Sequence, residues 1–493
     1  MPVTMENQEP NRRELWLALI GVGAGVFMST LDSSIVNISL PTLVESFQTS
    51  FANIQWVVLS YLLVLTSLML GVARLGDMYN KKRIYLAGMI LFAFSSLLCG
   101  LAPNIHWLIA LRALQGLGAV LMQSLGMAIV TQIFPAKERG RVLGIMGGIV
   151  SIGIAVGPPL GGLLISLAGW PSVFWVNVPV GILAAWIVIR YVPDLKPSHP
   201  DQRFDFVGAL IVMALMSAYA LGMTRGQETG FGQPLTLVLL AAAAAGAGLF
   251  VWVERRISQP MVDLHLFQNP LFGLNLLMGL LVFIVLAGNF VMPFFLELVK
   301  GYPAQQVGWM LMAFPVIMGL VAPAAGALSD RFGSRGISFL GLVILLAGCL
   351  AVSTLREETG AWGFILRVLP MGLGFGLFQS PNNSAIMGSA PRERLGVASG
   401  LLSLSRTLGQ TSGVPLMGAL FTAQVHAAGN LPANLDVTEV APAFLVAGFD
   451  GTYRISAVLV FAAALLALFT WMLDKKVGIR AASQVQEKSS EIG

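Results

Sequence analysis

Long apolar runs, repeated along the whole chain, are the sequence feature that most restricts its fold. Crossing a bilayer takes roughly 20 predominantly apolar residues per helix, and fourteen such runs are present. Only 11% of the 493 residues are charged, against about 25% in ordinary soluble domains, so one water-soluble core cannot hide this surface. We therefore predict an all-α integral membrane protein with fourteen spans. The runs are residues 17–40, 54–73, 84–102, 107–130, 142–168, 173–192, 206–223, 234–253, 271–296, 306–328, 337–355, 361–386, 396–422 and 452–473.

The basic residues predict how these spans are oriented. If the N-terminus is cytoplasmic, 22 of the 29 Lys and Arg residues fall on the cytoplasmic side, as the positive-inside rule requires. We therefore expect both termini to be cytoplasmic, in a bacterial-type plasma (inner) membrane. The net charge of +5 is spread through short loops, which argues against a nucleic-acid partner and leaves membrane lipids as the surroundings.

An internal repeat divides the chain. The pattern Gly-Leu-Gly-x-x-Leu-x-Gln-Ser at residues 116–124 recurs at residues 372–380, 256 positions later. Trp56 precedes Asp77 by 21 positions, and a Trp and an Asp at 309 and 330 have the same spacing. Chance similarity between Gly- and Leu-rich helices is the alternative for either match alone. Because both matches fall in the same order at nearly the same offset, we predict two related halves.

Charged side chains inside the apolar runs are the first candidates for function. Arg112 lies in the fourth run and Asp32 in the first, and ionisable residues at such depth mark ion or substrate pathways by default. At about 1.5 Å per residue, Asp32 is about 12 Å from the outer end of its helix and Arg112 about 8 Å from the outer end of its own. We predict that they meet and form the proton-coupling pair. A static pair that only orients the two helices is the open alternative.

Other polar side chains in the runs are predicted to line a central substrate cavity. Arg406 is about 16 Å from the inner end of the thirteenth run, where an arginine needs a cavity, water or a partner. Pro381 and the two asparagines after it are expected to break the twelfth run and face the path. The predicted cavity residues are Gln115, Gln123, Asn289, Gln379, Asn382, Asn383 and Arg406.

Two loops with the same charge pattern are predicted to form a cytoplasmic gate. Residues 73–83 join the second and third runs, and residues 326–335 join the tenth and eleventh. Each is expected to be a tight turn that places an aspartate near a helix N-terminus with basic residues beside it, which suits a latch of charge and helix dipole. A solvated loop is the alternative. The predicted gate residues are Asp77, Lys81, Arg83, Asp330, Arg331 and Arg335.

The fifth run carries a dense glycine and proline pattern, Gly-Ile-Ala-Val-Gly-Pro-Pro-Leu-Gly-Gly, over residues 153–162. Glycines let a neighbouring helix approach closely, and prolines are tolerated where buried neighbours satisfy the backbone. We expect a bend and a packing seam here. The residues singled out are Gly153, Gly157, Pro158, Gly161 and Gly162.

The sequence offers no signature of an enzyme or of a nucleotide-driven pump. It has no Gly-x-x-x-x-Gly-Lys-Ser/Thr phosphate loop and no Gly-x-Ser-x-Gly elbow, and its four histidines lie scattered without metal-ligand spacing. We therefore expect no metal and no cofactor, with protons as the coupling ion.

Several of these segments resemble known motifs of the major facilitator superfamily. Residues 73–83 and 326–335 resemble the two copies of its loop motif, and residues 108–118 its arginine-bearing helix-4 motif. Residues 153–162 resemble its helix-5 antiporter motif. Fourteen spans, with segments 31–41 and 170–181, are similar to the fourteen-span drug:proton antiporter branch. In the first loop motif Ala73, Met78 and Asn80 replace the usual glycine, arginine and glycine, so that latch is expected to be the weaker one.

The resemblance and the repeat together predict the organisation of the chain. The resemblance implies a major facilitator fold, with two six-helix bundles and two extra helices between them. The expected divisions are an N-terminal bundle (1–192), a cytoplasmic linker (193–204), two inserted helices (205–254), a C-terminal bundle (255–474) and a cytoplasmic tail (475–493).

The predicted function is proton-driven export of lipophilic small molecules or drugs by alternating access. Acids are scarce inside the membrane, where Asp32 faces Arg112 and Arg406, with a solvated Glu297 and a snorkelling Arg367 near the outer rim. Neutral, anionic or monocationic substrates are therefore favoured over dications. A proton-linked uptake symporter and a non-transporting membrane sensor are the alternatives. We expect a monomer, and leave open whether a periplasmic adaptor extends the route.

Overall fold

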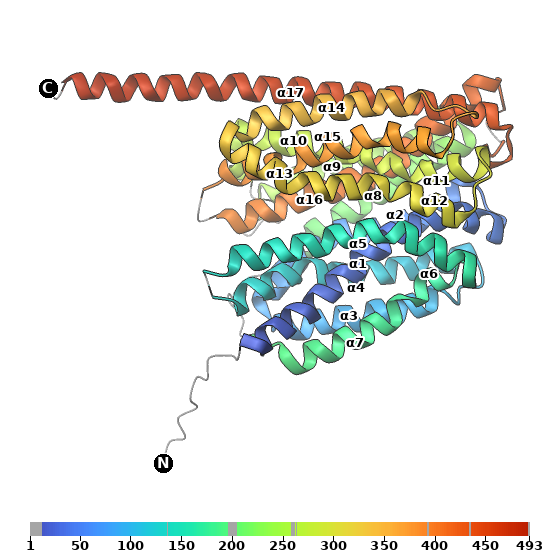
Figure 1. Ribbon diagram of the computed structural model, residues 1–493, viewed down its shortest axis with the longest axis horizontal. Coiled ribbons are helices and arrows are strands. Elements are labelled where there is room, and N and C mark those ends of the chain that lie inside the picture. The colour runs from blue at the N-terminus through green and yellow to red at the C-terminus, as the bar shows by residue number, and fades with distance from the viewer. Residues whose placement is uncertain are drawn as a thin grey trace, which may run out of the picture. The chain divides into compact units, whose positions relative to one another are not determined.

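The computed structural model describes residues 12–135, 137–195, 205–257, 262, 264–391, 394–432 and 435–491. For residues 77, 140, 396 and 474–491 it describes the backbone alone. All regular elements in this part of the chain are helices (Figure 1). The predicted linker and the side chains of the tail fall almost entirely outside the description.

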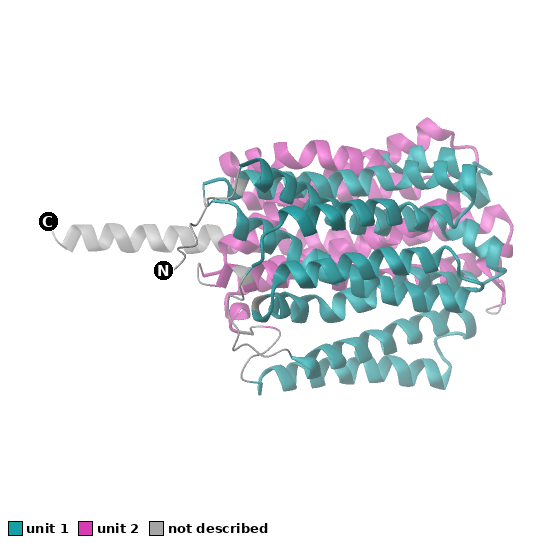
Figure 2. Ribbon diagram, turned by 90° about the horizontal axis from the view of Figure 1, so that it is seen from below, with its two compact units in different colours: residues 1–261, 296–312 teal, residues 262–295, 313–493 magenta. Residues whose placement is uncertain are grey.

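Two compact units divide the chain (Figure 2): unit 1 is Met1–Met261 with Leu296–Met312, and unit 2 is Val262–Phe295 with Ala313–Gly493. Segment 296–312 of the predicted C-terminal bundle thus belongs to unit 1. The α-helices of unit 1 are α1 (Arg12–Phe47), α2 (Phe51–Met78), α3 (Lys81–Cys99), α4 (Ile105–Ile133), α5 (Arg139–Ala168), α6 (Ser172–Trp175), α7 (Asn177–Tyr191), α8 (Phe206–Thr229), α9 (Pro234–Glu254) and α12 (Ala304–Leu311).

Unit 2 contains the remaining long helices. They are α10 (Pro270–Ala287), α13 (Ala313–Phe332), α14 (Ser334–Ser353), α15 (Ala361–Gly388), α16 (Leu395–Gly429) and α17 (Pro442–Glu491). Shorter elements are η1 (Leu264–Gln268), η2 (Gly288–Val291), α11 (Met292–Phe294), the π-helical η3 (Phe295–Val299), which crosses from unit 2 into unit 1, and η5 (Val437–Glu439).

Each of the fourteen predicted runs is helical. Thirteen helical segments of the described residues are long and apolar enough to cross a membrane. The remaining run, the thirteenth at residues 396–422, lies in α16, whose many Ser, Thr and Gly residues lower its hydropathy. The chain is therefore an all-helical multi-pass membrane protein.

Three of the predicted single helices are interrupted, and prolines explain where. Pro179 and Pro315 have no N–H to donate to the residue four positions earlier, so α6 ends at Trp175 and α12 at Leu311. Pro293 likewise leaves the carbonyl of Asn289 without an α-helical partner, and η2, α11 and η3 replace a regular helix there.

Pro381 behaves differently from the prediction. The expected break at Pro381, Asn382 and Asn383 does not occur, because α15 runs without interruption from Ala361 to Gly388. Prolines inside membrane helices are tolerated where neighbouring helices satisfy the freed backbone, and Pro381 is buried. The two asparagines therefore project from a continuous helix.

The glycines of the repeat have the same packing role in both units. A Cβ on Gly116 of α4 would lie 2.7 Å from the Tyr61 carbonyl oxygen of α2, and one on Gly118 would lie 2.8 Å from that of Gly88 on α3. In unit 2, a Cβ on Gly372 of α15 would lie 2.8 Å from the Phe314 carbonyl oxygen of α13. One on Gly374 would lie 2.7 Å from the carbonyl oxygen of residue 341 on α14. The sequence repeat thus corresponds to one repeated arrangement of helices.

The helix pair α8 and α9 is attached to unit 1 through α2. A buried amide pair joins them, in which Gln55 Nε2 donates to Gln227 Oε1 at 2.8 Å. Buried polar groups are costly unless bonded, so this pair fixes the position of α8 against α2. The inserted helices therefore belong to unit 1.

Candidate functional site

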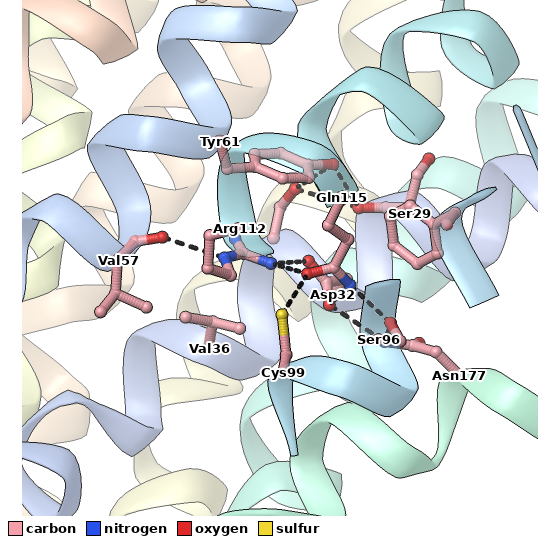
Figure 3. Close-up of polar contacts among 12 residues, drawn as sticks. Ser29, Asp32, Val36, Val57, Tyr61, Ser96, Cys99, Arg112, Gln115 and Asn177 are labelled. Atoms are coloured by element: carbon pink, nitrogen blue, oxygen red, sulfur yellow. Dashed lines mark hydrogen bonds and ion pairs between the residues drawn. The ribbon is translucent and has the colours of Figure 1, made fainter. Parts of the chain in front are cut away.

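Five helices of unit 1 bring a cluster of polar side chains together around Asp32 (Figure 3). We call Asp32 of α1, Tyr61 of α2, Ser96 of α3, Arg112 and Gln115 of α4, and Asn177 of α7 the Asp32 cluster. Asn104 begins α4 by accepting a hydrogen bond from the backbone N–H of Trp107 at 3.1 Å. Arg112 and Gln115 then lie three residues apart, on the same face of α4.

An ion pair forms the centre of the cluster. Arg112 Nη1 donates to Asp32 Oδ2 at 2.5 Å. The side chain of Asp32 is 0% exposed and that of Arg112 is 1% exposed. Burial at this level weakens screening by water and makes an unpaired charge costly, so each charge depends on the other. The structure thus brings together the two residues that the sequence singled out.

Amide side chains complete the coordination of the carboxylate. Asp32 Oδ1 accepts hydrogen bonds from Gln115 Nε2 at 2.8 Å and from Asn177 Nδ2 at 3.0 Å. The Ser96 hydroxyl accepts from the same two amides, at 2.6 and 3.2 Å. Asp32 therefore receives three donors, from α4 and α7.

Arg112 has its own set of partners. Its Nε donates to the Val57 carbonyl oxygen at 2.9 Å, and its Nη1 also donates to Gln115 Oε1 at 2.7 Å. Its Cζ lies 4.4 Å from the centre of the Tyr61 ring, within the range of a cation–π interaction. The guanidinium is therefore held by α2 and α4 even apart from its bond to Asp32.

Sequence reasoning missed three members of the cluster. Ser96 and Tyr61 resemble ordinary small and aromatic residues of apolar helices, and no spacing rule distinguishes them. Asn177 had a visible signal, because it is an amide in the middle of an apolar run, beside Pro179. Asn177 is the first residue of α7, and its Nδ2 donates to Asp32 Oδ1.

The other predicted cavity residues do not join this cluster. Gln123 Nε2 lies 3.4 Å from the Ser29 hydroxyl in unit 1. Asn289, Gln379, Asn382, Asn383 and Arg406 belong to unit 2. There, Tyr453 donates to Asn289 Oδ1 at 3.2 Å, and Asn382 Nδ2 donates to the Asn275 carbonyl oxygen at 3.4 Å.

The predicted gate residues lie mainly at helix ends and not in long loops. Residues 73–78 belong to α2 and residues 326–332 to α13, so only two residues separate α2 from α3 and one separates α13 from α14. Lys81 is buried, Arg335 is half-buried, and the remaining described gate side chains are exposed; these are Arg83, Asp330 and Arg331. The side chain of Asp77 lies outside the description.

The glycines of the fifth run form two contact faces on α5. A Cβ on Gly153, Gly157 or Gly161 would overlap side chains of α1, and one on Gly162 would lie 2.8 Å from the Cα of Gln305 in α12. A Cβ on Gly308 of α12 would in turn overlap the carbonyl oxygen of Pro158. The expected seam thus packs against α1 on one side and α12 on the other, and α5 is one uninterrupted helix.

Two predicted rim residues differ in their surroundings. The Glu297 side chain was expected to be solvated, but its Oε1 atom is buried without a hydrogen-bond partner among the described residues. Glu297 lies in the π-helical turn η3. Arg367 donates to Thr354 Oγ1 and to the Gly363 carbonyl oxygen, both at 2.9 Å.

Nowhere in the described chain do three or more His, Cys, Asp or Glu side chains gather as metal ligands do.

Comparison with known proteins gives one family over most of the chain. The family model described as Major Facilitator Superfamily matches residues 22–414 and 277–491. The solved structure of a bacterial homolog to the human lysosomal transporter Spinster, inward-facing and unoccupied, matches with a TM-score of 0.69 at 17% identity. That match covers 93% of this chain and 97% of the other, and it shows the likeness of fold.

Three curated relatives cover most of the chain. The multidrug resistance protein Stp of Mycobacterium tuberculosis is 37% identical, covering 85% of this chain and 78% of the relative. The riboflavin transporter RibZ of Clostridioides difficile is 32% identical, covering 93% and 98%. The tetracenomycin C resistance and export protein of Streptomyces glaucescens is 31% identical, covering 83% and 76%.

Proposed function

Because the chain belongs to the major facilitator superfamily and is a membrane transporter rather than an enzyme, we propose that it exports lipophilic small molecules in exchange for protons. The observation that carries this proposal is the Asp32–Arg112 pair. A fully buried carboxylate in a membrane helix is a site where a proton can be bound and released, and its partner on another helix links that event to helix packing.

Protonation of Asp32 changes the bonding of the whole cluster. The ionised carboxylate only accepts, and it ties α1 to Arg112 and Gln115 of α4 and to Asn177 of α7. A neutral carboxyl loses the ionic bond to Arg112 and becomes a donor at one oxygen. Arg112 keeps its bonds to Val57 and Gln115, so α4 stays attached to α2 while its hold on α1 weakens. Binding a proton thus shifts the balance between two arrangements of α1 and α4.

The gradient supplies enough energy for uphill transport. One proton crossing a potential of about 150 mV gives about 3.5 kcal/mol, which supports a solute gradient of up to a few hundredfold. In our proposal the transporter takes up a proton at Asp32 from outside and releases it inside, and the substrate leaves in the opposite direction. Access to the substrate site alternates between the two sides of the membrane, as is general for transporters built from repeats.

Export of drugs is favoured by the relatives. Stp is named a multidrug resistance protein, and the Streptomyces relative a resistance and export protein. RibZ is named a riboflavin transporter, so this level of similarity also includes transport of a single metabolite. We propose the fourteen-span drug:proton antiporter type, in the plasma membrane of a bacterial-type cell, with cytoplasmic termini and a monomer as the working unit.

The decisive test replaces Asp32 by Asn in proteoliposomes with an imposed pH gradient. We expect the steady-state accumulation ratio to fall from up to a few hundredfold to about one, because the proton site is lost. Downhill counterflow of the same compound is expected to continue, since the amide still accepts from Gln115 or Asn177. Substrate-induced pH change in the lumen is measured in parallel.

Glu45→Gln is the matched control. Glu45 is exposed near the end of the same helix, α1, and lies outside the Asp32 cluster. It is expected to behave like the wild type. An Asp32→Asn protein that still accumulates substrate at wild-type rates would remove Asp32 from proton coupling. Uptake into right-side-out vesicles, with none into inverted vesicles, would instead establish the symporter.

A further inference from the structure

We propose that Arg406 is the binding group for an anionic substrate, so that the transporter selects lipophilic organic anions over neutral and cationic compounds. This inference rests on the proposed transport function and specifies the substrate class. It starts from a difference between the two units. Unit 1 contains a buried cation with a bonded buried anion, whereas unit 2 contains a cation at membrane depth without one.

Arg406 is a charge without a counter-ion among the described side chains of unit 2. It lies on α16, about 16 Å from the first residue of that helix. No hydrogen bond or ion pair joins its guanidinium to another residue in the described part of the protein, and its Nε is buried without a partner. Arginine at such depth normally faces a partner or a wet cavity.

The helices around Arg406 carry no acid that could pair with it. The sequences of α10, α14, α15 and α16 contain neither Asp nor Glu. In α13 the acid is Asp330, which is exposed near the helix end. In the membrane-spanning part of α17 it is Asp450, which pairs with Arg454 at 2.6 Å. None of the described acids on these helices therefore neutralises Arg406, and an anionic ligand could do so.

The repeat explains why the ion pair is absent here. Val368 of α15 stands 256 positions after Arg112, in the same place in the repeated pattern, and it is buried. Unit 2 therefore does not contain a second copy of the Asp32 cluster. Its charge is on α16 instead, and no described acidic side chain of unit 2 pairs with it.

A hydrogen-bond acceptor without a partner, on α15, lies beside the same face of α10 that Arg406 of α16 contacts. A Cβ on Gly279 would lie 3.6 Å from Asn382 Nδ2 and 3.8 Å from Ser405 Oγ, so α15 and α16 approach α10 at that point. Asn382 Oδ1 is buried without a hydrogen-bond partner among the described residues. One turn further along α10, the Arg406 Cζ lies 5.3 Å from the centre of the Phe283 ring.

A row of three packed aromatic rings begins beside the guanidinium. Phe283 packs edge-on against Phe375 at 5.6 Å between ring centres, and Phe375 stacks on Phe314 at 6.1 Å. The row crosses from α10 to α15 and α13. The acidic group of a ligand can bond to Arg406, with its apolar body beside the Phe283 ring and a second polar atom donating to Asn382 Oδ1. A cationic head at the same place would face an unscreened like charge.

Binding of three probes of equal size tests the proposal on purified full-length protein in nanodiscs. The probes are 2-naphthoate, 2-naphthamide and 2-naphthylmethylammonium, with charges of −1, 0 and +1 on one ring system. We expect the wild type to bind naphthoate at least about tenfold more tightly than either other probe, as a hydrogen-bonded charge pair would give. We expect Arg406→Gln to abolish that preference and Arg406→Lys to keep part of it.

Arg367→Gln is the control, because it removes an equal charge from unit 2 at a place bonded to Thr354 and Gly363. It should leave the preference unchanged. A wild type that binds the amide or the amine as tightly as naphthoate, or that binds no naphthoate, overturns the proposal even if no variant folds. So does a folded Arg406→Gln protein with the full preference. The binding assay uses no proton gradient, so it is independent of the proteoliposome assay. If naphthoate is preferred here but substrate causes no pH change in the proteoliposomes, proton coupling is refuted and this inference stands.

Discussion

Asp32 shows how much a single residue depends on neighbours that are distant in sequence. Its carboxylate has donors from residues 112, 115 and 177, and the serine at 96 orients two of them. The acid and the arginine were predictable, since charges in apolar runs are conspicuous. Their amide and hydroxyl partners were not, because such residues occur throughout membrane helices and bond equally well to their own backbone.

Tyr61 gives a residue-scale prediction. Replacing it by Leu removes the ring that lies 4.4 Å from the Arg112 Cζ, and we expect a loss of about 1–2 kcal/mol in the free energy of unfolding. Tyr61→Phe retains the ring and should stay close to the wild type, since the hydroxyl makes only 3.5 Å contacts. Titration with SDS in mixed micelles measures both. Equal losses in the two variants would mean that the hydroxyl matters and the ring does not.

At the scale of whole elements, helix ends were set by prolines and helix contacts by glycines. Pro179 and Pro315 end α6 and α12, whereas Pro381 lies within an unbroken α15. The sequence alone does not distinguish the two prolines that end a helix from the one that does not. Whether a helix breaks depends on the neighbours that satisfy the freed carbonyl, and those come from the tertiary structure.

The seam between α5 and α1 gives an element-scale prediction. A methyl group on Gly157 would lie 2.7 Å from Ser34 Cβ and 3.1 Å from the Ile35 backbone nitrogen, so Gly157→Ala must displace α1. We expect a loss of about 1–3 kcal/mol, as for overpacking in cores. Gly147→Ala is the matched control on the same helix, because nothing lies within 4 Å of its Cβ position. Thermal unfolding in detergent compares them, and equal stability of the two variants would contradict the close approach.

At the scale of the whole molecule, the chain is a transporter of two related halves with an attached helix pair. The repeat was visible as a sequence pattern, and Gly116 and Gly372 have equivalent contacts in their units. The predicted boundaries of the bundles and the fourteen-span arrangement stay predictions. Unit 1 also includes α12, which the sequence alone assigned to the other half, because glycines 162 and 308 allow α5 and α12 to touch closely.

Cysteine labelling tests the arrangement across the membrane. The native Cys99 and Cys349 are both 0% exposed, so a membrane-impermeant maleimide should leave the wild type unlabelled. Gly232→Cys, in the exposed turn between α8 and α9, is expected to be labelled in intact cells. Lys137→Cys, between α4 and α5, should be labelled only after permeabilisation. The opposite result for Gly232→Cys would contradict the outward turn that fourteen spans require.

The sequence by itself determined that this protein is a helical membrane transporter with a repeated core and rare charges at membrane depth. The length of the apolar runs and the uneven distribution of Lys and Arg are properties of local composition, so they can be read from the sequence without knowing which residues are in contact. Only the tertiary structure decided that Asp32 has three donors and that Arg406 has no counter-ion among the side chains described for its unit. A hydrogen bond requires two groups within about 3 Å, and that distance is set by how helices from separate parts of the chain pack together.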